Sequence, residues 1–282
     1  MLIAQITDIH LGFDPDNPAE YNRKRLDAVL DVLIDGPNRP DLLIATGDIT
    51  DCGDAGSYTQ LKAAFSRCPF PVWPSVGNHD LRDPFHAAFP GFDDGAGFVQ
   101  YAIELPELRL VTIDTLEEGR HGGAFCDARA AWLDAELAKD GGKPTYIVMH
   151  HPPIESGIEW MNTHPGEPWV DRLTRVVRRH PQVRGLICGH LHRSVTVAWE
   201  GRTIAICSST APQVSLDLRA IDPDRPDDRP MIVAEDPAYA LHHWNGRELV
   251  SFYDHAGAHT TLARYDERLQ PLVRELKAER PE

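Results

Sequence analysis

Five short motifs carry side chains that could bind metal ions, and each stands at or just past the end of an apolar run. They are Asp8-Ile9-His10, Gly47-Asp48, Gly77-Asn78-His79-Asp80, His150-His151-Pro152-Pro153 and Gly189-His190-Leu191-His192. Imidazole nitrogens, carboxylate oxygens and an amide oxygen form a ligand set that suits Zn, Mn, Fe or Co. The candidate ligands are too many for one ion and fit a pair of ions: Asp8, His10, Asp48, Asn78, His150, His190 and His192.

The spacing inside the motifs lets neighbouring ligands face the same ion. In an extended chain, side chains two residues apart point to the same side, so Asp8 can act together with His10, and His190 with His192. One such motif alone is a weak signal, because a histidine near a strand end is usually a hydrogen-bonded structural residue. Structural histidines have no reason to follow this order, and the five motifs together predict a metal centre.

The elements that must position these motifs alternate between strands and helices over the first two-thirds of the chain. Apolar runs predict strands at residues 2–7, 41–46, 71–76, 98–103, 109–113, 145–149, 183–188, 194–199 and 203–207. Helical spacing of apolar residues predicts helices at 21–34, around 58–65, at 127–139 and at 169–179. Loops at the carboxyl ends of strands in an open α/β sheet converge on one edge. The alternation therefore predicts an α/β fold with mixed sheets, in which the motifs can meet at one rim.

The composition limits the partners of the protein. The chain has 282 residues and a formal net charge of −15, so binding to nucleic acid polymers or anionic membranes is disfavoured. A small anionic substrate is still allowed if bound cations reverse the local field. No apolar run approaches the ~20 residues that span a bilayer. The N-terminus has no basic leader and runs directly into Asp8 and His10, so we expect a cytoplasmic protein.

In this order the motifs resemble the complete signature of the calcineurin-like metallophosphoesterase superfamily. Their spacing resembles its class III phosphodiesterases, which include bacterial glycerophosphodiesterases and cyclic-nucleotide phosphodiesterases. The resemblance covers nearly the whole chain, including Gly123-Ala124-Phe125 leading into Ala131-Trp132-Leu133. It implies a four-layer αββα sandwich of two mixed sheets with a C-terminal extension. We expect residues 1–210 to form the catalytic domain, and residues 211–282 to add strands and an extension that could cap the site or contact another subunit.

The resemblance also implies how the ligands divide between two divalent ions. One ion would be held by Asp8, His10, Asp48 and His192, and the other by Asp48, Asn78, His150 and His190. Asp48 would bridge the two ions, and His151 matches the motif but not a ligand position. Two ions about 3.5–4 Å apart can clamp a phosphate and supply a bridging hydroxide that attacks phosphorus. The expected reaction is hydrolysis of a small phosphodiester, either a glycerophosphodiester or a cyclic nucleotide, bound by Asn78, His79 and His192.

His79 is the expected catalytic residue, because it adjoins Asn78 and is not itself assigned to a metal. It could protonate or hydrogen-bond the leaving group. Asp51 could orient His79, as carboxylates often orient catalytic imidazoles, or it could be a turn aspartate. Four other histidines are interpreted as solvated loop or helix residues: His86, His121, His164 and His180. A C-terminal group could reach the substrate rim: His242, His243, His255 and His259.

Three other functions compete with a diesterase. Protein phosphatases and other monoesterases share the fold, but protein phosphatases of this superfamily usually have Arg after the second aspartate of the Gly-Asp motif, where this chain has Cys52 after Asp51. A non-catalytic scaffold would lack ligands, and here every ligand position is filled. A nuclease is disfavoured by the acidic charge and the lack of a basic stripe.

Three peripheral segments have open roles. The loop at 152–168 contains Trp160, which could line the pocket together with Trp169 and Tyr21, or these aromatic residues could pack in satellite clusters. Residues 219–237 are rich in Asp, Arg and Pro and are expected to be a surface excursion. An apolar stripe at 269–276 could pack on a second subunit in a homo-oligomer, or on its own domain.

Overall fold

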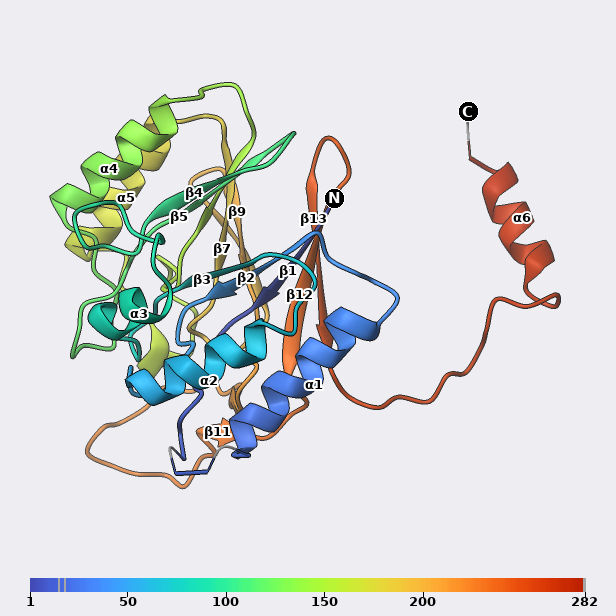
Figure 1. The fold of residues 1–282 in the computed structure, drawn as a ribbon, viewed down its shortest axis with the longest axis horizontal. Helices are drawn as coiled ribbons and strands as arrows, with labels where there is room; N and C mark the ends of the chain where they lie inside the picture. Colours follow the sequence, from blue (N-terminus) through green and yellow to red (C-terminus); the bar gives the residue numbers. More distant parts are fainter. Residues whose placement is uncertain (15, 18, 281–282) are drawn as a thin grey trace.

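Two mixed β-sheets form the centre of the computed structural model, which describes residues 1–14, 16–17 and 19–280 (Figure 1). Within these residues one sheet has the strand order β13-β12-β1-β2-β3 and the other β4-β5-β6-β7-β9-β8. The first comprises β1 (Leu2–Ile6), β2 (Leu42–Thr46), β3 (Val72–Ser75), β12 (Ala238–Trp244) and β13 (Leu249–His255). The second comprises β4 (Tyr101–Glu104), β5 (Arg109–Thr112), β6 (Thr145–Val148), β7 (Val183–Cys188), β8 (Val195–Trp199) and β9 (Arg202–Ile206). A short pair, β10 (Gln213–Val214) and β11 (Ile232–Val233), lies apart from both sheets.

Both sheets combine parallel and antiparallel pairs, as the sequence predicts. Strand β1 runs parallel to β2 and antiparallel to β12. In the other sheet, β5, β6, β7 and β9 are parallel, whereas β4 and β8 are antiparallel edge strands. Parallel neighbours bring their carboxyl ends to the same edge, so the loops after β1, β2 and β3 lie together, as do those after β6 and β7.

Helices cover the two sheets on opposite sides and complete four layers (Figure 1). On one side lie α1 (Tyr21–Asp35), α2 (Ala55–Phe65) and α3 (Arg82–Ala88), and on the other α4 (Asp127–Ala138) and α5 (Pro168–Arg179). Leu26 of α1 and Leu61 of α2 are buried in one apolar cluster with the first sheet, and Leu133 of α4 and Leu173 of α5 in a second cluster with the other. Full burial of each such side chain contributes about 1.5–3 kcal/mol. The expected αββα sandwich is confirmed.

Strand β12 lies inside the first sheet, between β1 and β13, although its sequence gives no alternation of polar and apolar residues. His242 on this strand is fully buried: it donates from Nε2 to Gln5 Oε1 at 3.0 Å and accepts from Ser251 Oγ at 2.7 Å. Burial lowers the pKa of His242 to about 4, which keeps the ring neutral. The suggestion that this histidine reaches the substrate rim is therefore wrong.

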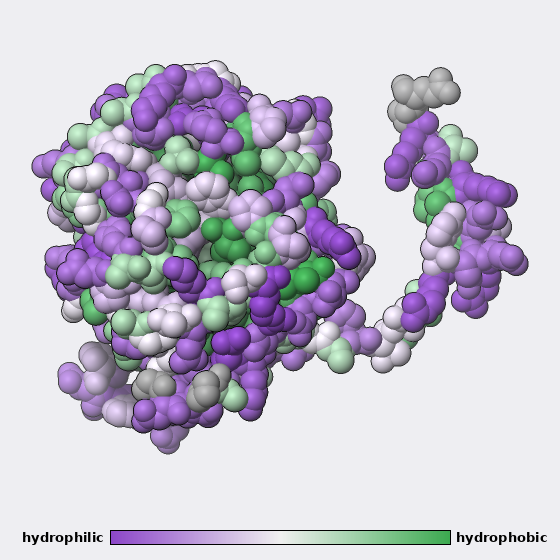
Figure 2. Space-filling view, in the orientation of Figure 1, coloured by the Kyte–Doolittle hydropathy of each residue, from purple (hydrophilic) through white to green (hydrophobic). Residues whose placement is uncertain are grey.

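The residues after β13 form a tail that leaves the body of the protein. Its helix α6 (Gln270–Ala278) lies away from both sheets in Figure 1, and Figure 2 shows a gap between the tail and the body. Leu272 and Leu276 are 51% and 49% exposed. In the described residues the apolar stripe thus does not pack on its own domain.

Of the helices described, none combines the length and the apolar character needed to cross a bilayer.

Candidate metal centre

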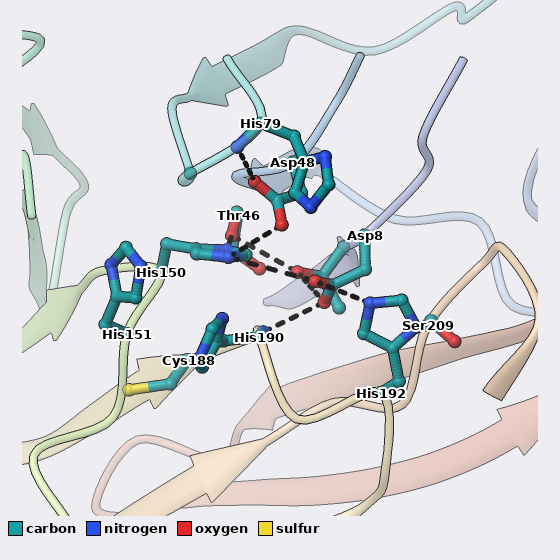
Figure 3. Close-up of polar contacts among 12 residues, drawn as sticks. Asp8, Thr46, Asp48, His79, His150, His151, Cys188, His190, His192 and Ser209 are labelled. Carbon is teal, nitrogen blue, oxygen red and sulfur yellow. Dashed lines mark hydrogen bonds and ion pairs between the residues drawn. The ribbon is translucent and has the colours of Figure 1, made fainter. Parts of the chain in front are cut away.

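The seven candidate ligands come together at the carboxyl ends of strands from both sheets. Asp8 and His10 follow β1, Asp48 follows β2, and Asn78 follows β3. From the other sheet, His150 follows β6, and His190 and His192 follow β7. Figure 3 shows His150 and His192 pointing from opposite sides toward Asp8, with Asp48 beside them. The group lies at a cavity of about 750 Å³.

Asp48 lies at the middle of the cluster. Its Oδ2 is 3.2 Å from His150 Nε2 and 3.8 Å from His10 Nε2, so one carboxylate faces imidazoles from two separate strand ends. Its Oδ1 accepts a hydrogen bond from the backbone N–H of His79 at 2.8 Å. A carboxylate in this position could contact two cations at once.

Asp8 connects the ligands of the second sheet to those of the first. Its Oδ1 is 3.3 Å from His192 Nε2 and 3.8 Å from His150 Nε2, and its Oδ2 accepts from the backbone N–H of His190 at 3.0 Å. His10 Nε2 lies 3.3 Å from His192 Nε2. Donor atoms of Asp8, His10 and His192 all lie within 4.8 Å of one another, and so do those of Asp8, Asp48 and His150.

Three buried polar atoms of the cluster make no hydrogen bond of normal geometry among the described residues. Asn78 Oδ1 is one of them, and the other two, Asp8 Oδ1 and His150 Nε2, are held only by the ion-pair contacts of 3.2–3.8 Å given above. Buried polar atoms are nearly always paired, because each unpaired one costs free energy. All three are typical ligand atoms of first-row divalent metals. The chemistry of the donor set therefore fits divalent cations.

The imidazoles are held so that Nε2 faces the centre. His150 donates from Nδ1 to Thr46 O at 2.9 Å, and His192 donates from Nδ1 to Pro212 O at 2.8 Å. His10 donates from Nδ1 to Asp51 Oδ1 at 3.1 Å. A hydrogen bond from the far nitrogen fixes the tautomer and ring orientation of a metal-binding histidine and raises its basicity.

The backbone at the cluster is strained. Of the seven residues other than glycine that have positive φ in the described part of the chain, five are candidate ligands: Asp8, His10, Asp48, His190 and His192. Left-handed backbone costs roughly 1–2 kcal/mol for such a residue, and it concentrates at functional sites. Donor atoms of Asp8 and His10 thus lie within 4.8 Å of each other on left-handed rather than extended backbone, which corrects the geometry that their spacing suggested.

Two glycines allow the ligand loops to approach closely. A Cβ on Gly47, whose φ is +87°, would lie 2.6 Å from His150 Nδ1. A Cβ on Gly77 would lie 2.7 Å from His150 Cδ2 and would collide with Asp48. A side chain at either position would push apart the two sheets where they meet at the cluster.

Comparison with known proteins agrees with this geometry. The family model described as calcineurin-like phosphoesterase matches residues 1–194. The chain belongs to the calcineurin-like phosphoesterase family. It is 30% identical over 249 residues to the probable glycerophosphodiester phosphodiesterase GpdQ of Arcobacter nitrofigilis, covering 86% of this chain and 89% of that one. It is 27% identical to the 3′,5′-cyclic adenosine monophosphate phosphodiesterase CpdA of Escherichia coli K12, and the match covers 75% of this chain and 76% of that one. A dimetal phosphatase from Danio rerio has the same fold, with a TM-score of 0.57 and 16% identity. The match covers 89% of this chain and 98% of that one.

The charges in this phosphoesterase compensate one another inside the cluster. Burial alone would raise the pKa of Asp48, but His150 and His10 hold it well below its usual range. Burial likewise opposes ionisation of Asp8, yet His192 and His150 bring its pKa to about 2. Burial would lower the pKa of His150, but Asp48 and Asp8 raise it to about 9. Both carboxylates are thus anionic at neutral pH, and a proton on His150 supplies part of the positive charge that cations would bring.

The Asp51 carboxylate contacts a different histidine from the one expected. Its Oδ1 accepts from His10 at 3.1 Å and is 4.0 Å from His79 Nδ1. His79 instead donates from Nδ1 to the backbone carbonyl of Asp51 at 2.9 Å. The hydrogen bond of the Asp51 side chain is thus to His10, and that of its main chain is to His79, while an orienting effect of the side chain on His79 stays a prediction.

His151 is held in the interior behind the ligands. It donates from Nε2 to His121 O at 3.2 Å and accepts at Nδ1 from Thr115 Oγ1 at 2.8 Å. Both ring nitrogens are therefore occupied by hydrogen bonds. His151 lies close enough to His150 and His190 to form a third ligand group, but these bonds leave it no free nitrogen for a cation.

The outer walls of the cavity are aromatic and apolar. They include Tyr21, Trp160 from the 152–168 loop, and Ile232 from the 219–237 excursion. Trp169 is only 5% exposed and donates from Nε1 to Glu167 at 2.9 Å, so it packs in the interior. His121 is an exposed loop residue, as the sequence indicated, and it also lines the cavity. No motif marks it, because its position depends on a loop fixed by contacts distant in the sequence.

Proposed function

We propose that this phosphoesterase hydrolyses small phosphodiesters with a pair of divalent ions, Mn, Fe, Zn or Co. The observation that carries the proposal is the set of buried ligand atoms on Asp8, Asn78 and His150 that make no hydrogen bond of normal geometry beside the Asp48 carboxylate. Bound there, the ions would polarise the phosphoryl oxygens and make water a nucleophile at neutral pH. The similarity to glycerophosphodiester and cyclic-nucleotide phosphodiesterases supports the same substrate class.

The proposed ligand sets share one carboxylate. One ion would be held by Asp8, His10, Asp48 and His192, and the other by Asp48, Asn78, His150 and His190. The contacts of His192 Nε2 with Asp8 Oδ1 and His10 Nε2, each 3.3 Å, support the first set. The 3.2 Å contact of His150 Nε2 with Asp48 Oδ2 supports the second. All of these ligands lie within residues 1–210, the proposed catalytic domain, whereas residues 211–282 add β12 to the first sheet and Ile232 to the cavity wall.

His79 is proposed to contact the phosphoryl group. Its backbone is anchored to Asp48, its Nδ1 is engaged by Asp51 O, and its Nε2 is the nitrogen left for substrate. Its ring also packs edge-on against His10, with centroids 4.6 Å apart. Donors fixed in this way stabilise charge that develops on phosphoryl oxygens. Asn78 and His192 line the same cavity and are proposed to contact substrate too.

The cavity lining favours a diester over a monoester. Among the described residues that line it, none is Lys or Arg, and its other carboxylates include Asp51 and Glu167. A monoester dianion brings one more negative charge than a diester, and this wall carries no Lys or Arg to balance it. The alcohol portion of a diester, whether acyclic or cyclic, can instead contact the apolar residues that line the cavity.

The test compares two aryl substrates on one preparation. Metal-free protein is reconstituted with Mn²⁺, and turnover of bis(p-nitrophenyl) phosphate and p-nitrophenyl phosphate is measured at equal concentration. Preference for the diester is expected, and Asp48→Asn should abolish turnover of both substrates. Preference for the monoester would overturn the diesterase assignment, and hydrolysis without dependence on added metal would overturn the proposed chemistry.

A further inference from the structure

A second imidazole lies beside His79 on the wall of the cavity. His121 belongs to the loop between β5 and α4, and its ring centroid is 5.9 Å from that of His79. Both rings line the same cavity. His121 is exposed, so it lies on the side from which a product alcohol can leave.

The loop that carries His121 is fixed to the interior. The backbone carbonyl of His121 accepts a hydrogen bond from His151 Nε2 at 3.2 Å, and His151 is fully buried next to the ligand His150. Three residues further along, Ala124 N donates to Thr115 O at 2.9 Å, and Thr115 also holds His151. The backbone of His121 is therefore tied to the metal centre through one buried side chain, which fixes the point from which the exposed ring projects at the cavity.

The two imidazoles differ in which nitrogens are available. Nδ1 of His79 is bound to Asp51 O, and its backbone N–H to Asp48, so His79 is fixed close to the proposed ions. Neither ring nitrogen of His121 is engaged by another group in the described part of the chain. His79 is suited to hold a phosphoryl oxygen, whereas His121 can carry a proton to an oxygen further from the ions.

We propose that His121 is the proton donor to the leaving alcohol, while His79 holds the phosphoryl group; this rests on the proposed diesterase function. The attacking water forms the new P–O bond and loses one proton to solvent. The bond from phosphorus to the leaving oxygen breaks, its electron pair stays on that oxygen, and the oxygen takes a proton from the His121 imidazolium. The imidazole then regains a proton from solvent, so the sum is diester plus water giving monoester plus alcohol.

The proposal predicts a dependence on the leaving group. An alkoxide is a poor leaving group and needs a proton as the bond breaks, whereas p-nitrophenolate is a stable anion and needs none. Removing a general acid costs on the order of 100-fold or more for a substrate that needs it. His121→Ala should therefore lower kcat for an alkyl diester and leave kcat for an aryl diester almost unchanged.

The experiment measures kcat for glycerophosphocholine and bis(p-nitrophenyl) phosphate with Mn²⁺-loaded protein, His121→Ala, His121→Gln and His79→Ala. His164→Ala is the matched control, because that ring is 70% exposed and pairs with Glu155 outside the cavity lining. Metal content and thermal midpoint of each variant show whether the fold and the centre persist.

We expect both His121 variants to lose roughly 100-fold in kcat for glycerophosphocholine alone, with metal content unchanged. His79→Ala should lower turnover of both substrates. Equal losses for the two substrates in the His121 variants, or an alkyl-specific loss in His79→Ala only, would overturn the assignment to His121. Unmodified protein that fails to hydrolyse bis(p-nitrophenyl) phosphate would instead overturn the proposed function.

Discussion

Replacing Asp51 should weaken the binding of one metal ion and not the other. The Asp51 carboxylate accepts from His10 Nδ1 at 3.1 Å, and its side chain is only 20% exposed, so solvent screens the contact weakly. His10 belongs to the proposed ligand set of the first ion, and its Nε2 faces Asp48 and His192. Loss of Asp51 would remove the hydrogen bond that orients the His10 ring and leave the ring free to rotate.

The expected size follows from the hydrogen bond that is lost. Removing the partner of a metal-binding histidine typically costs 10–100-fold in affinity, which is about 1.4–2.7 kcal/mol. Asp51→Asn keeps an oxygen acceptor but loses the charge, so about tenfold is expected. Asp51→Ala removes the acceptor, so a loss of about 100-fold is expected.

The assay is a competition titration of metal-free protein against a chromophoric chelator, which resolves two binding steps. Asp140→Asn is the control, because Asp140 is exposed and hydrogen-bonds only to its own turn among the described residues. If Asp51→Ala binds both ions as tightly as the unmodified protein while turnover falls, Asp51 acts on His79 and the reasoning from the His10 contact is refuted.

Three further predictions concern the bridging carboxylate of Asp48, the buried Arg25 that supports a ligand loop, and the dependence of folding stability on pH. Asp48→Asn should weaken both ions by more than about 100-fold, because a shared ligand is lost, and metal analysis after dialysis measures this. Arg25 is 5% exposed and donates to Thr210 O, Ala211 O and Gln213 Oε1. Arg25→Met leaves Thr210 O without a donor among the described residues and removes one of the two donors to Ala211 O and to Gln213 Oε1. It should lower the free energy of unfolding by about 1–3 kcal/mol in urea titrations, with weaker metal binding through the loop that orients His192. The folded pKa of His242, about 4, lies below its unfolded value of 6.5, so stability is lost as pH falls from 6.5 toward 4, by up to about 3 kcal/mol. His242→Gln should flatten this acid limb in denaturation measured across pH, and an unchanged slope would show that another group causes it.

The sequence is informative where a function is carried by short local motifs. Each ligand of the cluster follows a strand with a simple apolar pattern, so the position of Asp48 or His150 at a strand end could be predicted from neighbouring residues. The order of motifs then limited the fold to one known architecture. Strands β1 to β9 and helices α1, α2, α4 and α5 agree with the periodicity, because their apolar faces repeat within a few residues, whereas helix α3 was not predicted.

The rest depends on contacts between residues far apart in the chain. Strand β12 is buried on both faces and so lacks alternation, and its pairing with β1 joins residues more than 200 positions apart. The choice of the Asp51 carboxylate between His10 and His79 is decided by side-chain geometry within a few ångströms. The position of His121 depends on a carbonyl held by His151, which no local pattern reveals.

Anomalous diffraction from crystals of the Mn²⁺-loaded protein tests the metal centre most directly. Two manganese peaks about 3.5–4 Å apart are expected, with the Asp48 carboxylate between them. Asp8, His10 and His192 should coordinate one ion, and Asn78, His150 and His190 the other. A single peak, or two peaks that do not share Asp48, would contradict the dinuclear centre on which the proposed hydrolysis depends.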